Sequence, residues 1–151
     1  MNDGKLGVAI FGAGNVARAH AASWTKNPRA EIVAVGSRRR ETAQRLIDEL
    51  GLACPATDDF DAVLADSRVD VVNLSGPNHV HAPQGIAAAE AGKHILVEKP
   101  MAITMDENRA LRDAVNRAGI RSIVSFVLRW IPLSVNVKSL LAAGAIGDMF
   151  H

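Results

Sequence analysis

LGVAIFGAGNVA, residues 6–17, is the stretch of sequence that decides the fold of this chain. Its apolar run over residues 7–11 predicts a buried strand, and a helical pattern follows immediately after the glycines. Gly12 supplies the backbone freedom of a tight turn, Gly14 lets a ligand approach the backbone, and Ala17 lets helix and strand pack closely. The free N–H groups at the start of the helix then face an anion, so this unit is predicted to bind a dinucleotide pyrophosphate.

Glycine pairs occur in many turns, so the prediction of a dinucleotide site also depends on the pattern of strands and helices in the rest of the chain. Further apolar runs predict strands over residues 30–36, 69–74, 94–97 and 121–127. Between them, helical patterns cover residues 15–26, 41–50, 58–66, 80–91, 105–118 and 130–143. Near-continuous apolar strands separated by amphipathic helices predict an α/β fold, a Rossmann-type doubly wound parallel sheet with helices on both faces. Ligands of such sheets bind at the carboxyl ends of the strands.

Several helix ends carry recognisable capping residues. Gly51 is expected to end the helix over residues 41–50, and Thr104 to begin the one over 105–118. For the short helix over residues 58–66, either Thr57 or Asp58 is the expected cap.

The composition excludes several classes of protein. The 151 residues suffice for one domain with a proper core, and 48% hydrophobic with 22% charged residues indicates a globular protein. A formal charge of +1 gives no electrostatic reason to expect nucleic acid or a membrane surface as partner. The apolar runs fall short of a membrane span, and no signal peptide is expected before the first strand. The single cysteine, Cys54, is expected to be a loop residue in a cytoplasmic protein.

The residues after the second strand bear on the choice of cofactor. Many NAD-binding proteins carry an acidic residue here that binds the ribose 2′-hydroxyl, whereas this chain has Ser37 and Arg38. A hydroxyl and a guanidinium suit a 2′-phosphate, so NADP is the preferred cofactor, with NAD possible. The alternative is that Arg38 and the two arginines after it form a solvated helix start.

The loop after residues 69–74 has the sequence SGPNHVH. Asn78 is placed either to cap the next helix or to present its amide to a ligand. His79 and His81 are two positions apart and do not share a helix face, so no metal site is expected. Capping and surface roles explain this loop about as well as a binding site does.

Glu98, Lys99 and Pro100 follow the apolar strand over residues 94–97. Charged groups at the end of a buried strand are costly unless they are paired or used. A lysine there can hydrogen-bond a substrate hydroxyl and exchange a proton with it. Pro100 restricts the backbone of Lys99 and is a candidate cis proline. The alternative is an exposed Glu–Lys pair.

Four segments in this order carry a family resemblance: GAGNVA with His20 three positions on, GPNHVH, AGKHILVEKP and FVLRWIP. Together they resemble the Gfo/Idh/MocA oxidoreductases, the group that contains glucose-fructose oxidoreductase and inositol dehydrogenase. The resemblance covers essentially the whole chain, and AGKHILVEKP is its most specific part.

The resemblance implies NAD(P)-dependent hydride transfer at a hydroxyl carbon of a sugar, inositol or related polyol. Lys99 would be the catalytic residue that contacts the substrate hydroxyl, and Glu98 would hold the nicotinamide side of the cofactor. Asn78 would lie near the nicotinamide ribose on a wall shaped by its neighbours, and two residues of the last strand would approach the nicotinamide. The cofactor-binding residues expected overall are Gly12, Gly14, Asn15, Val16, Ser37, Arg38, Pro77, Asn78, His81, Glu98, Arg129 and Trp130. The replacement of the acidic residue after the second strand resembles the NADP-using members.

The resemblance also implies a second domain. We expect residues 1–143 to be the dinucleotide-binding domain and residues 144–151 to begin a substrate and oligomerisation domain that the chain does not contain. His151 does not occupy the position of the family's downstream acid/base histidine. The chain is therefore expected to be the cofactor half of a two-domain enzyme, either as a truncated gene product or as a shortened chain. Alone it should be weakly active or inactive, and its full-length form is expected to be a homo-oligomer.

Two other functional classes stay open, and so does association of the chain with itself. A nucleotide sensor or scaffold would bind the cofactor without a reaction, and a methyltransferase could also use a glycine turn but would leave Lys99 without an evident role. The apolar residues Ile146, Met149 and Phe150 would mediate association if an exposed edge drives it.

Overall fold

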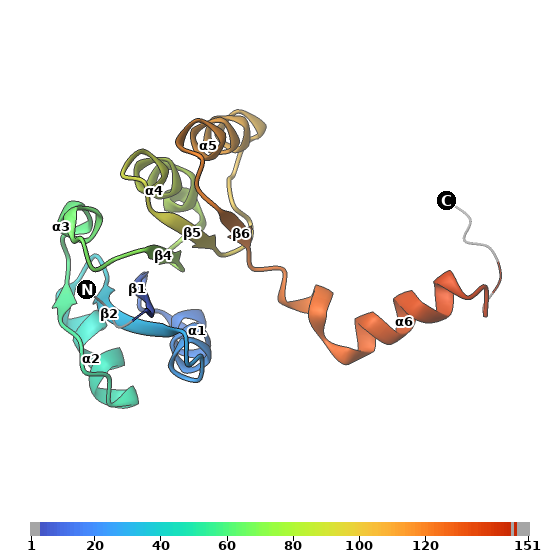
Figure 1. Cartoon of the computed structure of the whole chain (residues 1–151), viewed down its shortest axis with the longest axis horizontal. Helices are drawn as coiled ribbons and strands as arrows, with labels where there is room; N and C mark the ends of the chain where they lie inside the picture. Colours follow the sequence, from blue (N-terminus) through green and yellow to red (C-terminus); the bar gives the residue numbers. More distant parts are fainter. Residues whose placement is uncertain (1–3, 146, 148–151) are drawn as a thin grey trace.

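The computed structural model describes residues 4–145 and 147 and contains one six-stranded parallel sheet (Figure 1). Its strands are β1 (Leu6–Phe11), β2 (Ala30–Gly36), β3 (Ala56–Thr57), β4 (Val71–Leu74), β5 (His94–Val97) and β6 (Ser122–Val124). The spatial order is β3-β2-β1-β4-β5-β6, and every neighbouring pair is parallel. This order reverses direction between β1 and β4, which is the switch point of a Rossmann fold. The predicted fold class is confirmed.

The helices cover both faces of this sheet. They are α1 (Asn15–Thr25), α2 (Arg40–Leu50), α3 (Phe60–Ala65), α4 (Asn78–Glu90), α5 (Met105–Ala118) and α6 (Pro132–Ala142), with a short 3-10 helix η1 (Val127–Trp130). Figure 1 shows α1 and α2 on one side of the sheet and α3, α4 and α5 on the other. The glycine loop between β1 and α1 therefore lies beside the switch point.

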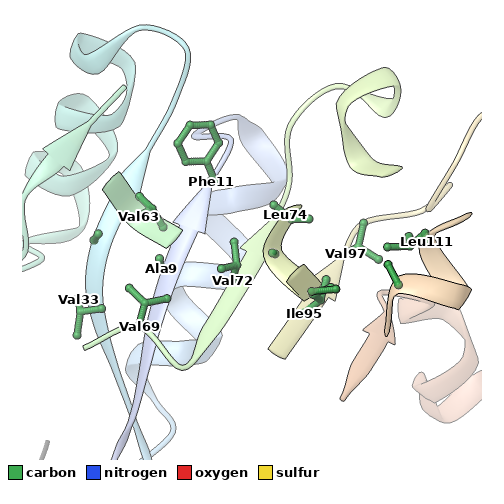
Figure 2. Packing of buried hydrophobic residues seen from close by; sticks show 14 residues of the cluster. Ala9, Phe11, Val33, Val63, Val69, Val72, Leu74, Ile95, Val97 and Leu111 are labelled. Carbon is green, nitrogen blue, oxygen red and sulfur yellow. The ribbon is translucent and has the colours of Figure 1, made fainter. Parts of the chain in front are cut away.

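Strand β1 shows why both faces are covered. Successive side chains of a strand point to opposite faces. Val8 and Ile10 pack with residues of α1 and α2, whereas Ala9 and Phe11 pack with residues of α3, α4 and α5. The second of these clusters, drawn in Figure 2, continues through Val72 and Leu74 of β4 to α5. A strand buried on both faces must be apolar at every position, as the sequence of β1 is.

Two helix starts differ from the expectation. Asp59, rather than Thr57 or Asp58, caps α3, and its carboxylate accepts a hydrogen bond of 2.9 Å from the backbone N–H of Ala62. Thr57 is not available for this role because it belongs to β3, and its hydroxyl accepts from the N–H of Asp59. Helix α4 begins at Asn78 and Pro77 occupies the cap position, so of the two alternatives for Asn78 the structure excludes the cap.

The cap of α5 is as predicted. The Thr104 hydroxyl accepts from the N–H of Glu107, and the Glu107 carboxylate accepts from the N–H groups of Ile103 and Thr104. These two backbone donors lower the pKa of Glu107. Gly51 ends α2 in the left-handed conformation, also as predicted.

The C-terminal part of the described chain leaves the sheet. Strand β6 ends at Val124, so the predicted strand over residues 121–127 is too long, and η1 follows. Figure 1 shows α6 extending away from the sheet, and its side chains Leu133, Val135 and Leu140 are exposed. In the described residues no helix is long and apolar enough to cross a membrane. Ile146, Met149, Phe150 and His151 lie outside the described residues.

Candidate functional site

The glycine loop is fastened to both neighbouring strands. Gly12 has φ +107°, a conformation that L side chains rarely adopt, and its N–H donates to the carbonyl of Gly36 at 2.8 Å. The Ser75 hydroxyl donates to the carbonyl of Gly12 at 2.8 Å. A Cβ at Gly12 would lie 2.2 Å from the backbone nitrogen of Gly76. The predicted tight turn is confirmed, and the loop after β4 packs directly against it.

The N-terminus of α1 carries free donors beside open space. Gly14 is the cap residue, it offers no side-chain cap, and the first turn holds no acidic residue. A Cβ built at Gly14 meets nothing within 4 Å, and Asn15 and Val16 are exposed. Unsatisfied N–H groups at a positive helix end bind anions. This cradle fits a pyrophosphate, and Ala17 behind it is fully buried, as the close packing of helix and strand requires.

Basic residues follow β2. The backbone N–H of Ser37 donates to the carbonyl of Thr57 at 3.0 Å. Arg38 and Arg39 are exposed, and Arg39 occupies the cap position of α2 without a side-chain capping hydrogen bond. No acidic residue occupies the end of β2.

The loop between β4 and α4 combines exposed and buried groups. Pro77 and Asn78 are exposed at the sheet edge. His81 is 1% exposed, and its ring nitrogens lie 2.7 Å from the carbonyl oxygen of Pro100 and 2.9 Å from that of Gly76. His81 thus ties this loop to the segment after β5, and any contribution to a cofactor wall would be indirect. In residues 4–145 and 147 no group of three or more potential metal ligands gathers.

Lys99 lies on an open groove after β5. The groove has a volume of about 350 Å³ and is lined by Lys99, Ser125, Phe126, Val127, Leu128 and Arg129. Lys99 is exposed, and the peptide bond between Lys99 and Pro100 is cis. Arg129 and Trp130 lie on η1 and not on a strand, which corrects their predicted placement; Trp130 is 72% exposed and is not part of the groove lining.

Glu98 is buried, and its partner differs from the Glu–Lys pair considered as an alternative. Its Oε1 lies 3.1 Å from Nε2 of His20, and its Oε2 accepts from the backbone N–H of Lys99 at 3.1 Å. The other ring nitrogen of His20 lies 2.9 Å from Oδ1 of Asn73. Sequence reasoning did not assign a role to Asn73. The signal was a polar residue inside the apolar run over residues 69–74.

The predicted site residues thus follow five different strands at the carboxyl edge of the sheet. The cradle follows β1, Ser37 and Arg38 follow β2, the loop with Asn78 follows β4, Glu98 and Lys99 follow β5, and the groove wall follows β6. The carboxyl edge of a doubly wound sheet is where dinucleotides bind.

Comparison with known proteins identifies this arrangement. Residues 6–126 match the model of the oxidoreductase family with an NAD-binding Rossmann fold. Levoglucosan dehydrogenase of Pseudarthrobacter phenanthrenivorans is 34% identical, with 94% of this chain and 38% of the relative covered. The scyllo-inositol 2-dehydrogenase (NAD(+)) of Bacillus subtilis is 34% identical over 95% of this chain and 42% of the relative. D-xylose 1-dehydrogenase (NADP(+)) 2 of Haloferax volcanii is 36% identical over the same two shares.

Solved structures agree. Levoglucosan dehydrogenase in complex with NADH and L-sorbose superposes with a TM-score of 0.86 at 33% identity, covering 95% of this chain and 40% of that one. A 3-ketoreductase from Actinomadura kijaniata in complex with NADP gives a TM-score of 0.87 at 26% identity, covering 95% and 46%. The chain spans about two fifths of the length of the curated relatives that it matches. It belongs to the Gfo/Idh/MocA oxidoreductase family and forms that family's NAD-binding Rossmann fold.

Proposed function

We propose that this chain is the cofactor-binding half of an NAD(P)-dependent oxidoreductase that transfers a hydride between nicotinamide and a hydroxyl carbon of a sugar, inositol or related polyol. The observation that carries the proposal is that the Gly12–Gly14 cradle and the Lys99 groove both follow the carboxyl ends of strands of one parallel sheet. The names of the relatives, which are dehydrogenases of levoglucosan, scyllo-inositol and D-xylose, support the substrate class.

The cradle residues would hold the dinucleotide at its phosphates. Gly12 and Gly14 leave space for the pyrophosphate, and the first N–H groups of α1, at Asn15 and Val16, face it. Pro77 and Asn78 would line the path toward the nicotinamide, with His81 holding their loop in place. The bound dinucleotide supplies the hydride acceptor or donor.

Lys99 and Glu98 would serve the reacting end. The exposed amino group of Lys99 on its groove can hydrogen-bond a substrate hydroxyl; as the neutral amine it would accept the hydroxyl proton, and as the ammonium it would return it. Glu98 would contact the nicotinamide side, and Arg129 and Trp130 would approach from η1. Positioning of the substrate carbon is the larger part of such catalysis. We assign most of it to a second domain that begins at residues 144–151, after a cofactor domain of residues 1–143, in a full-length homo-oligomer.

Titration of the 151-residue chain tests the proposal. We expect NADPH and NADH to bind and S-adenosylmethionine, the cofactor of the methyltransferase alternative, to leave the protein fluorescence unchanged. With polyols the chain should form NADPH slowly or not at all; rapid polyol-dependent formation would contradict the assignment of positioning to a second domain. If neither dinucleotide binds, the proposed function fails.

We propose NADP as the preferred cofactor, because Ser37 and Arg38 stand where an acidic residue would repel a 2′-phosphate. Changing Arg38 to Asp should raise the Kd of NADPH about tenfold or more, since hydrogen bonds to charged groups contribute that much, and leave the Kd of NADH nearly unchanged. Arg40→Asp is the matched control, because it makes the same charge change two residues further on, in the first turn of α2. Equal effects of Arg38→Asp on both dinucleotides would overturn the preference and favour the solvated helix start.

A second function rests on the same cradle. A sensor or scaffold that binds the dinucleotide without chemistry also needs Gly12 and Gly14 but does not need Lys99. Replacement of Lys99 distinguishes the two functions, because it would impair an oxidoreductase and leave a sensor intact.

A further inference from the structure

Four side chains form a continuous polar chain beneath the carboxyl edge of the sheet. Nε1 of Trp24 donates to Oδ1 of Asn73 at 3.0 Å, and Nδ1 of His20 lies 2.9 Å from the same oxygen. Nε2 of His20 lies 3.1 Å from Oε1 of Glu98. The chain thus runs from α1 through the middle of the sheet, at β4, to the segment after β5. The Ser125 hydroxyl, 3.5 Å from Nε2 of His20, stands at its end.

The hydrogen-bond partners determine where the protons lie. The indole nitrogen of Trp24 can only donate, so the atom of Asn73 that faces it must be the carbonyl oxygen and not the amide nitrogen. The same oxygen faces Nδ1 of His20, which must therefore carry a proton. This fixes the orientation of the His20 ring and turns Nε2 toward Glu98.

The contact between His20 and Glu98 also needs one proton. Two lone pairs cannot face each other at 3.1 Å, so either Nε2–H donates to the carboxylate or the carboxyl group donates to Nε2. The two side chains are 12% and 9% exposed, so water replaces this contact poorly. The second carboxylate oxygen receives the N–H of Lys99. Both carboxylate oxygens of Glu98 therefore have a hydrogen-bond partner. The next residue along the chain, Lys99, lines the groove.

The burial of Asn73 indicates that the hydrogen bonds among these four side chains have a purpose. It is fully buried, and its Nδ2 has no hydrogen-bond partner among the described residues. An unpaired buried donor carries a desolvation cost that an apolar residue would avoid. The residues beside it in β4, Val72 and Leu74, are apolar. The amide oxygen, which receives both Trp24 and His20, accounts for a polar residue at this position.

We propose that His20, anchored by Asn73 and Trp24, is the positioning residue that orients the Glu98 carboxylate toward the nicotinamide end of the dinucleotide. His20 touches neither cofactor nor substrate in this role and acts through Glu98. The inference rests on the proposed function, in which Glu98 contacts the nicotinamide side.

Two ligands separate this role from a general structural one. NADPH carries the nicotinamide, whereas 2′-phospho-ADP-ribose has the same adenosine and pyrophosphate without it. His20→Leu should raise the Kd of NADPH about tenfold, as loss of one charge-assisted hydrogen bond does, and leave the Kd of 2′-phospho-ADP-ribose within about twofold. Glu98→Gln should have the same pattern. The double variant should be no weaker than either single one, because residues that act through one contact are not additive.

Ser23→Ala is the matched control on the same helix, because among the described residues its exposed hydroxyl bonds only to the carbonyl of Ala19. It should leave both Kd values unchanged. Equal weakening of both ligands by His20→Leu, or additive effects of His20→Leu and Glu98→Gln, would overturn the proposal. If the unaltered chain binds neither ligand, the proposed function itself has failed.

A measurement without any variant covers the case in which His20→Leu does not fold. A long-range ¹H–¹⁵N spectrum of the unaltered chain reports which ring nitrogens of His20 carry protons. We expect Nδ1 of His20 to carry a proton, because this nitrogen faces the same oxygen of Asn73 that accepts from Trp24. An unprotonated Nδ1 would show that Asn73 does not anchor His20 and would overturn the proposal.

Discussion

Replacing Gly12 by Ala is expected to lower the free energy of unfolding by about 3 kcal/mol, the sum of a strained left-handed backbone and an overpacked contact. The added Cβ would lie 2.2 Å from the backbone nitrogen of Gly76 and 2.5 Å from the carbonyl carbon of Ser75. Backbone atoms cannot turn aside as a flexible side chain can. For a domain of marginal stability this is a large loss. Urea unfolding followed by the fluorescence of Trp24 and Trp130 measures it.

Gly14→Ala is the matched control for this variant. The cap position has φ −87°, which alanine adopts without strain, and a Cβ there meets nothing within 4 Å. Its stability should change by less than about 1 kcal/mol, whereas its affinity for NADPH should fall, because the methyl group would occupy the space that the pyrophosphate approaches. Gly12→Ala with the stability of the unaltered chain would show that the two loops are not packed as described.

Replacing Lys99 by Ala is expected to lower kcat for polyol oxidation about 10²- to 10⁴-fold in the full-length form proposed above, the range for loss of a positioned proton-transfer group. The Kd of NADPH should change little, since the Lys99 side chain lies on the groove and not in the cradle. Steady-state kinetics and a separate titration divide the two effects. Lys99→Arg should restore little activity, because an arginine remains protonated and cannot exchange the proton.

Lys93 provides the control for Lys99. It precedes β5 at the opposite end of the strand, and its ammonium donates to the backbone carbonyls of Asp66 and Val69. Lys93→Ala should therefore affect stability and leave kcat unchanged. Unaltered turnover in Lys99→Ala would exclude Lys99 as the catalytic residue. Dinucleotide binding without any turnover in the unaltered full-length form would favour the sensor function.

The sequence predicted the features that depend on local pattern. The apolar run of β1, and the helical periodicity of α5 together with its Thr104 cap, lie within a few neighbouring residues. The positions of these two elements are therefore confirmed nearly to the residue. The two-residue strand β3 has no pattern of its own, because it is a strand only through its pairing with β2. The cap of α3 depends on that pairing as well, since β3 occupies Thr57.

The site divides in the same way. The cradle and the Lys99 segment could be located because a glycine turn and charged residues after an apolar run are local signals. The partner of Glu98 could not be, because His20 and Glu98 are 78 positions apart and meet only when α1 packs on the sheet. For Arg129 and Trp130, a short apolar run does not distinguish a strand from the 3-10 helix that the chain forms.

Because α6 extends away from the sheet, it is not expected to unfold cooperatively with the rest of the fold. The helix has 11 residues, a length that is marginal in water without tertiary contacts. Most of its apolar side chains are exposed and none belongs to the two core clusters, so its helical state gains little from the core that holds the strands together. Fraying of α6 therefore leaves the cradle at Gly12 unaffected, and the stability of the dinucleotide-binding fold resides in the residues up to about the end of β6.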